Sequence, residues 1–252
     1  MRTKSVLLIP IGGVPLIQPG DDLVQMLLGR LRAAGDRLKT GDILVVTQKI
    51  VSKSEGPLVD LRSCRPSRQA RHLARFTGKD PRLVELVLRE SKKVLRHGPN
   101  LIVTEHRQGW VCANAGIDFS NVPGEEVTLL PRDSDHTARR MRRRIKALTG
   151  AEVAVLIVDS HGRPFRRGAV GVAIGTAGIS ALVNKRGARD LFRYRLRGTE
   201  IALADEVASA ASLLMGQADE GIPAVILRGL NYPKGWAKAL DLIRPEANDL
   251  FR

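Results

Sequence analysis

The sequence lacks the long apolar segments that mark a membrane or secreted protein. Among its 252 residues there is no run of about 18 uninterrupted apolar residues, the length that a helix needs to span a bilayer. The N-terminal segment MRTKSVLLIPIGG has neither the long apolar stretch nor the small-residue cleavage site of a secretory signal. We therefore expect a cytoplasmic protein without membrane contact.

Cysteine and aromatic residues are also scarce. The two cysteines, Cys64 and Cys112, form neither a CxxC pair nor a cluster with the spacing of a zinc site. Free cysteine is usually buried, so both are interpreted as ordinary core thiols. Aromatic residues make up 4% of the chain, which leaves few platforms on which single-stranded nucleic acid can stack its bases.

The common phosphate-binding signatures are missing as well. No GxxxxGK[ST] segment occurs, and the glycines at positions 168, 171, 175 and 178 do not form GxGxxG. Any bound nucleotide must therefore be held by other groups.

Basic residues, in contrast, are abundant. The 41 Lys and Arg against 26 Asp and Glu give a formal charge of +15, which attracts nucleic acids, nucleotides and acidic metabolites alike. The densest run, ARRMRRRIKAL, places Ala138, Met141, Ile145 and Leu148 at spacings of three and four. This pattern predicts an amphipathic helix with its arginines in solvent. It favours a solvated surface over a nucleic-acid-binding helix, although a basic nucleic-acid-binding protein stays an alternative function.

The apolar pattern predicts a mixed α and β (α+β) fold. Short β-branched runs that read as buried strands occur at residues 6–9, 43–46, 101–104, 153–158 and 223–227. Helical periodicity and capping residues predict helices at residues 21–33, 81–95 and 200–214. The last helix is rich in Ala and Ser, which permits close packing, and we expect it to be central. No linker-like segment divides the chain, so residues 1–252 are expected to form one module.

Two carboxylate-containing segments follow apolar runs. Asp118 and Asn121 lie in a short polar turn, where an Asx side chain either bonds its own backbone or serves a site. Asp159 and Ser160 are expected at the end of a buried strand, just before the basic segment RPFRR at 163–167. Their hard oxygen atoms suit Mg²⁺ or Mn²⁺, and the arginines suit phosphates or carboxylates. A loop in which Asp159 pairs with a nearby arginine is the plainer alternative.

Two further segments are candidates for anion binding. MGQADEGIP, residues 215–223, is a loop that can bring backbone N–H groups close to a phosphate or base, or is only a helix-to-strand connection. TQKIVSKSEG, residues 47–56, carries Lys49 and Lys53 after a buried strand. These two lysines either reach an anion or belong to an ordinary surface turn.

Taken together, these segments resemble one family, the coenzyme F-420-0:L-glutamate ligases. The segments that carry the resemblance are GVPLIQPGDDL (13–23), GDILVVTQKIVSKSEG (41–56), VCANAGIDFSNV (111–122), VDSHGRPFRRGAVGVAIGTAGI (158–179), ADEVASAASLLMG (204–216) and GIPAVILRGL (221–230). Six long segments in the right order, over nearly the whole chain, make this signal specific.

The resemblance implies a nucleotide-driven amide ligation. GTP would phosphorylate the lactyl carboxylate of the deazaflavin coenzyme, and the α-amine of L-glutamate would attack the acyl phosphate, releasing GDP and phosphate. Later glutamates would be joined through γ-carboxylates. The resemblance also implies Mg²⁺ or Mn²⁺, K⁺ as a further ion, and a homodimer of intertwined subunits with two closely packed subdomains. A related ligase acting on another acid is the alternative.

The resemblance also implies site residues by matching position. Asp118 and Asp159 look like metal ligands and catalytic residues, with Ser160 where the family often has Thr and Gln217 where some members have a metal-binding Glu. From their place just after Asp159, and not from the resemblance, Arg163, Arg166 and Arg167 are expected to orient substrate anions. The nucleotide contacts implied are Val14, Pro15, Leu16, Ile17, Gln48, Lys49, Lys53, Asn121, Met215, Gly216, Gln217, Ala218, Asp219, Glu220, Gly221 and Ile222. Gln48 and Lys49 replace small hydroxyl residues of some relatives.

Overall fold

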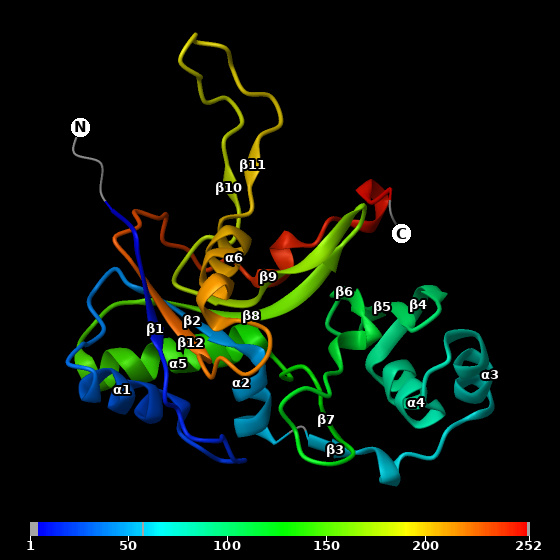
Figure 1. Ribbon diagram of the computed structural model, residues 1–252. Helices are drawn as coiled ribbons and strands as arrows, with labels where there is room; N and C mark the ends of the chain where they lie inside the picture. The colour runs from blue at the N-terminus through cyan, green and yellow to red at the C-terminus, as the bar shows by residue number, and fades with distance from the viewer. Residues whose placement is uncertain (1–4, 57, 251–252) are drawn as a thin grey trace.

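A mixed five-stranded sheet forms the centre of the protein, whose structure is a computed structural model that describes residues 5–56 and 58–250 (Figure 1). The strands, in sheet order, are β1 (Leu7–Ile11), β12 (Ala224–Arg228), β2 (Ile43–Thr47), β8 (Ala154–Arg163) and β9 (Arg166–Ala177). β2 and β8 are parallel, and the other neighbours are antiparallel. The predicted α+β fold is confirmed, and four of these five strands were predicted.

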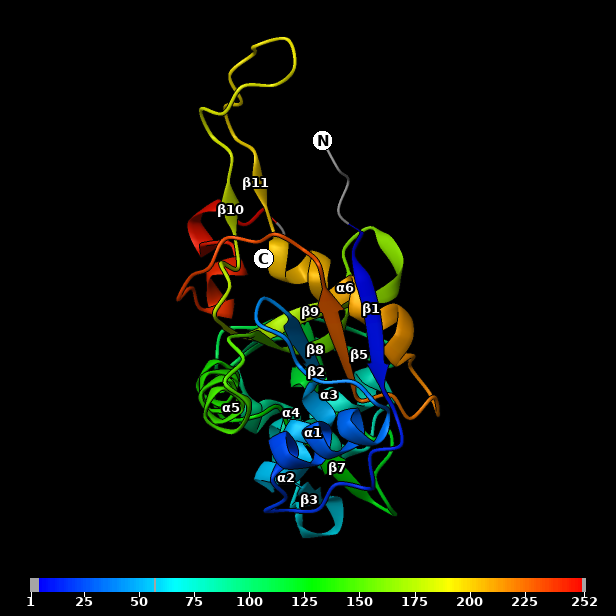
Figure 2. The same ribbon diagram turned by 90° about the vertical axis from the view of Figure 1, so that its left-hand side faces the viewer.

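Both faces of the middle of this sheet are buried, which explains why β2, β12 and the first half of β8 are apolar. Along β2, Leu44 and Val46 face one core, and Ile43 and Val45 face the other. Helices α1 (Leu23–Ala33), α2 (Gln48–Glu55) and α5 (Ser134–Thr149) cover the first face, and α6 (Leu203–Met215) covers the second (Figures 1 and 2). The central position expected for the Ala-rich helix is confirmed.

Strand β9, which the sequence did not predict, carries helices on both sides because of two glycines. A Cβ on Gly171 would lie 2.5 Å from the Ala208 carbonyl oxygen of α6, and one on Gly175 would lie 2.5 Å from the Ser134 carbonyl oxygen of α5. An irregularity in the β8–β9 register falls between these glycines. It shifts the alternation of side chains, so Ala173 joins the α6 core and Ile174 the α5 core.

A second lobe with its own apolar core lies between β2 and β8 in the chain. Its elements are β3 (Leu58–Asp60), η1 (Leu61–Ser63), α3 (Arg68–Thr77), α4 (Pro81–Glu90), β4 (Ser91–Gly98), β5 (Leu101–His106), β6 (Val111–Ala113), η2 (Asn114–Gly116) and β7 (Glu126–Thr128). Leu83 and Val87 of α4 pack with Ile102 of β5 and Val127 of β7.

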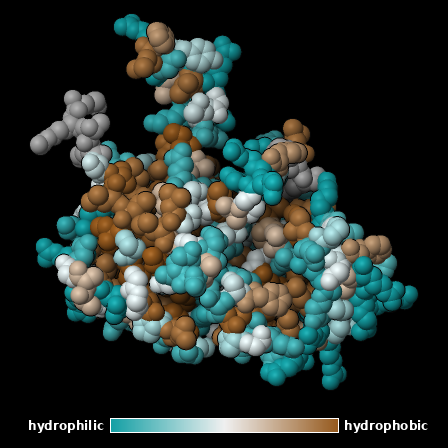
Figure 3. Space-filling view, in the orientation of Figure 1, coloured by the Kyte–Doolittle hydropathy of each residue, from teal (hydrophilic) through white to brown (hydrophobic). Residues whose placement is uncertain are grey.

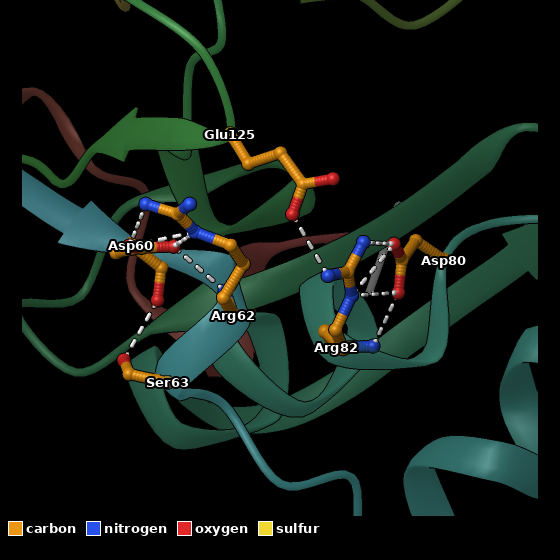
Figure 4. Close-up of polar contacts among 6 residues, drawn as sticks. All are labelled: Asp60, Arg62, Ser63, Asp80, Arg82 and Glu125. Atoms are coloured by element: carbon orange, nitrogen blue, oxygen red, sulfur yellow. Dashed lines mark hydrogen bonds and ion pairs between the residues drawn. The ribbon is translucent and has the colours of Figure 1, made fainter.

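Arginine pairs fasten the ends of this lobe's elements (Figure 4). Arg82 binds Asp80 at 2.6 Å within the first turn of α4 and Glu125 at 2.9 Å just before β7. Arg62 binds Asp60 at 2.7 Å where β3 passes into η1. The Arg62 guanidinium and backbone N–H lower the pKa of the Asp60 carboxyl. These pairs lie at the surface, so they fix local geometry more than they stabilise the lobe.

A long arm projects from the main body between β10 (Val183–Asn184) and β11 (Glu200–Ile201) (Figures 1 and 2). Leu191 is 98% exposed and Phe192 93% exposed at its end. After β12 the chain returns over β9 through η3 (Ala239–Leu242) and η4 (Glu246–Asn248). No helix within the part of the chain described is long and apolar enough to cross a membrane.

The structure corrects four expectations from the sequence. The helix predicted at 81–95 ends at Glu90, because Ser91 is extended and begins β4, which pairs with β5. The turn expected at 47–56 is helix α2. The strand expected to end at Asp159 continues to Arg163 as β8 and pairs with β9; its side chains are buried only up to Val158. Leu148 is 46% exposed, whereas the rest of the predicted α5 stripe is buried.

The close contact at Gly175 predicts a large effect of a single methyl group. Gly175→Ala should lower the free energy of unfolding by about 1–3 kcal/mol, because the Ser134 backbone must move away. Gly29→Ala in α1 is the control: open space surrounds Gly29, and alanine favours the helix by about 0.5–1 kcal/mol. Urea unfolding measures both variants, and equal stability of the two would contradict the packing described.

Candidate active site

A cavity of about 330 Å³ opens at one end of the central sheet. Segments that are distant in the chain meet there: the 14–17 segment, the start of α2, the turn at Asn121, the middle of β8, and the loop after α6. Its lining residues are Val14, Pro15, Leu16, Ile17, Thr47, Gln48, Lys49, Ile50, Lys53, Asn121, Val158, Asp159, Ser160, Gly171, Ser212, Met215, Gly216, Gln217, Ala218, Asp219, Gly221, Ile222 and Pro223. The volume is in the range of small-molecule sites.

The start of α2 gives this cavity positive potential. β2 passes directly into α2 at Thr47, whose side chain caps no first-turn N–H. The N–H groups at a helix start carry partial positive charge. Gln48 is 1% exposed; its Oε1 accepts from Ser52 Oγ at 2.9 Å, and its Nε2 has no hydrogen-bond partner among the residues described. This wall of the cavity therefore offers donors.

Two lysines, four residues apart on the same face of α2, add full charges. Lys49 Nζ lies 3.1 Å from Asp118 Oδ2 and donates to Ser120 Oγ. Lys53 Nζ donates to the Asn121 carbonyl oxygen. Burial lowers the pKa of Lys53, and the neighbouring charge of Lys49 lowers it further. Both ammonium groups thus belong to one wall of the cavity, an arrangement suited to a polyanion.

The turn at 118–121 has features of both alternatives that the sequence left open, a local Asx turn and a part of the site. Asp118 Oδ1 accepts from the Ser120 N–H at 2.7 Å, as an Asx turn does, while Oδ2 faces Lys49. Asn121 has φ +58° and donates through Nδ2 to the Ala218 carbonyl oxygen at 3.3 Å. The turn thus connects α2 with the loop after α6.

Asp159 and Ser160 form the opposite wall, in the middle of β8. Asp159 Oδ2 lies 3.2 Å from His161 Nε2, and both side chains are 15% exposed. Ser160 Oγ donates to Gln217 Oε1 at 2.8 Å. Burial raises the pKa of the nearby Cys112 thiol to about 12, and the charge of Asp159 adds to this rise. Both cysteines are buried, as predicted, and neither is bonded to a partner.

The structure brings most of the predicted site residues together at this cavity. Asp118 stands behind Lys49 rather than in the lining. Glu220 is directed to the Ala218 N–H. Arg163 and Arg166 pair with each other at the exposed end of the β8–β9 hairpin, outside the lining, because the strand continues past Asp159. The lining residues that sequence reasoning missed are Thr47, Ile50, Val158, Gly171, Ser212 and Pro223.

Ser120 was also missed, although a signal for it existed. It follows Asp118 by two residues, which is the position whose N–H an Asx turn uses. Gly171 and Ser212 carried no comparable signal, because their place at the cavity follows from the packing of α6 against β9.

Comparison with known proteins assigns the chain to a family. The sequence profile described as "F420-0:Gamma-glutamyl ligase" matches residues 13–229, which include every residue that lines it. The chain belongs to this ligase family. It is 49% identical over 252 residues to "Coenzyme F420:L-glutamate ligase" of Methanothermobacter thermautotrophicus, covering 98% of this chain and 99% of the relative.

Other relatives agree over similar lengths. The protein of the same name from Methanopyrus kandleri is 49% identical over 246 residues, covering 95% of this chain and 96% of the relative. That of Archaeoglobus fulgidus is 43% identical over 243 residues, covering 96% of this chain and 95% of the relative. The chain is therefore an amide-forming ligase, and the family predicted from the sequence is confirmed.

The donor atoms of the ligase cavity suit a hard cation that is only partly held by protein. Asp159, Ser160 and Gln217 contribute oxygen atoms on one wall. Within residues 5–56 and 58–250, no group of three or more His, Cys, Asp or Glu side chains forms a metal cage. Mg²⁺ is commonly bound by one or two carboxylates together with substrate phosphates, so the donor set fits such an ion.

The paired lysines predict an electrostatic coupling that can be measured. Lys49→Met should raise the pKa of Lys53, because a neighbouring positive charge is removed and Asp118 is released to act on Lys53. A pH titration of ¹³C-labelled lysine side chains by NMR detects the change. Lys79→Met is the control: Lys79 lies in the second lobe and burial alone lowers its pKa, so its removal should leave the pKa of Lys53 unchanged. An unchanged Lys53 titration in Lys49→Met would contradict the coupling.

Proposed function

We propose that this ligase uses GTP to join L-glutamate to the lactyl carboxylate of coenzyme F-420-0, through an acyl phosphate, and then adds γ-linked glutamates. The full-length likeness to proteins named coenzyme F420:L-glutamate ligase carries this proposal. The cavity supports it, because cationic and hydrogen-bond-donating groups of α2 lie across from the oxygen donors of β8.

Charge complementarity supports a nucleotide in this cavity. The proposed reaction brings a triphosphate and a carboxylate together, so negative charge must be neutralised where the acyl phosphate forms. Lys49 and Lys53 supply two ammonium groups on one side, and the start of α2 adds N–H dipoles. Lys49 can exchange its present partner for a phosphate at little cost, because Asp118 is 29% exposed and water screens the pair.

Asp159, Ser160 and Gln217 are the residues that we propose hold Mg²⁺ or Mn²⁺, with Asp118 as a second carboxylate. A bound divalent ion would polarise the phosphoryl oxygens and neutralise part of their charge. His161 Nε2 lies 3.2 Å from Asp159 Oδ2, beside the proposed ligand. K⁺ is part of the same proposal as a further ion.

The proposed role of Asp159 predicts a loss of turnover without a loss of fold. Asp159→Asn should lower the rate of glutamylation at least about 100-fold, because a carboxylate beside the phosphates is replaced by a neutral group. Mass spectrometry of coenzyme F-420-0 incubated with enzyme, GTP, Mn²⁺ and L-glutamate detects each added glutamyl unit.

A matched control removes one carboxylate charge outside the cavity. Glu206→Gln changes an exposed side chain of α6 and should leave the rate unchanged. Equal rates for wild type and Asp159→Asn would refute the assignment of Asp159. If the wild type gave no product heavier by a glutamyl unit with several nucleotides tried, the proposed reaction itself would be wrong.

We also propose that the ligase acts as a homodimer, on the evidence of two exposed apolar features. The arm ends in Leu191 and Phe192, and a two-stranded hairpin is at best marginally stable alone in water. An apolar area covers part of β1 and α6 below the arm (Figure 3). Val6 and Leu7 are 46% and 55% exposed there, and Leu213 is 79% exposed. Such surfaces are typical of subunit contacts.

Charge at the end of the arm should therefore prevent association. The double variant Leu191→Lys, Phe192→Lys is expected to sediment as a monomer, whereas the wild type sediments as a dimer. Phe76→Lys, at a 58% exposed position in the second lobe, is the control and should remain dimeric. Sedimentation velocity distinguishes the three proteins. A wild type that is monomeric at tens of micromolar would exclude the dimer.

A further inference from the structure

The loop that closes the cavity, residues 216–221, is held by one of its own side chains. Glu220 Oε2 accepts a hydrogen bond from the Ala218 N–H at 2.8 Å. The N–H groups of Ala218, Glu220 and Gln217 lower the pKa of the Glu220 carboxyl. Glu220 is exposed, so burial does not keep it in place. Converging backbone N–H dipoles attract an anion, and here the chain supplies that anion itself.

The backbone at Gly216 has the shape that this contact requires. Its φ of +68° and ψ of −167° lie in a region that is essentially restricted to glycine. A Cβ at this position would lie 1.8 Å from the Glu220 carboxyl carbon. The carboxylate therefore fills the space that the missing side chain leaves, and the end of α6 and Glu220 fit each other.

The opposite edge of the loop is turned toward the cavity. The Ala218 carbonyl oxygen accepts from Asn121 Nδ2 at 3.3 Å. Gln217 Oε1 accepts from Ser160 Oγ at 2.8 Å. Both donors line the cavity, as Gln217 and Ala218 do, whereas Glu220 is not among the lining residues. The loop thus has two sides: the Ala218 N–H donates to Glu220 on one, and on the other the oxygen atoms of Ala218 and Gln217 accept from cavity-lining side chains.

We propose that Glu220 is a positioning residue of the ligase: it anchors the loop so that Gln217 and the Ala218 carbonyl oxygen keep their places at the cavity. This rests on the proposed function, in which the nucleotide occupies that cavity. Without the carboxylate, the backbone amides lose their shared acceptor, and Gln217 is no longer held beside Ser160. Nucleotide binding should weaken, and the rate of the bound complex should change little.

Two measurements on Glu220→Gln and Glu220→Ala test this proposal. In the protein without nucleotide, ¹⁵N relaxation should show the order parameters of residues 217–221 falling from about 0.85 to below about 0.6 in Glu220→Ala, with a smaller fall in Glu220→Gln. In the glutamylation assay, KM for GTP should rise about tenfold in Glu220→Ala, and kcat should stay within about threefold. Glu206→Gln removes the same charge from the exposed side of α6 and should change neither.

The outcomes separate this proposal from the proposed function. Unchanged order parameters in Glu220→Ala would show that the carboxylate does not hold the loop. A looser loop with an unchanged KM would show that the loop shape does not matter for the nucleotide. A lower KM would mean that Glu220 competes with the nucleotide, which also overturns the proposal. Absence of GTP-dependent glutamylation in the wild type would refute the proposed function, while the relaxation data would still decide whether Glu220 positions the loop.

Discussion

The close approach of α6 to β9 is the constraint on which the cavity depends. Gly171 leaves no room for a side chain beneath the Ala208 carbonyl oxygen, and it pairs directly with Ser160 across the β8–β9 hairpin. The helix therefore ends above the part of β8 that carries Asp159 and Ser160. The loop that follows brings Gln217 to 2.8 Å from the Ser160 hydroxyl. The packing of the α6 backbone against β9 therefore sets how far the end of α6 lies from Asp159 and Ser160.

The excess positive charge divides into two populations with different surroundings. Lys49 and Lys53 are half-buried beside the cavity, where reduced solvation lowers the pKa of Lys53 and strengthens attraction for anions. The arginines of α5 lie at the surface, where Arg144 pairs with Asp22 at 3.1 Å and Arg140 with Glu55 at 3.6 Å. Water screens these pairs, so they contribute to solubility and long-range attraction more than to binding at one site.

Four strands of the central sheet were predictable from sequence because each contains a short apolar run, and in β2, β12 and the first half of β8 that run is buried on both faces, as ILVV in β2 shows. β9 was not, because Gly171 and Gly175 weaken strand propensity and their packing partners are distant in the chain. β4, with the sequence SKKVLRHG, is mostly polar and forms through pairing with β5. Most of the residues that line the cavity were named through the family resemblance, but those placed there only by packing, such as Gly171 and Ser212, were not. The position of Arg163 at the tip of the β8–β9 hairpin could not be predicted, because the polar second half of β8 gives no strand signal.

The neutral side chain of Gln217 has a consequence for how the proposed cation is held. A glutamate in this place would add a second charge beside Asp159, whereas the amide contributes only a dipole and already accepts from Ser160. Asp118, the other carboxylate of the proposed ligand set, is paired with Lys49. The proposed ligand set thus presents little negative charge of its own to a divalent ion, and affinity for such ions rises with the charge of the ligand set. In the proposed complex the nucleotide phosphates would supply the remaining charge, so we expect the metal to bind with the nucleotide rather than before it.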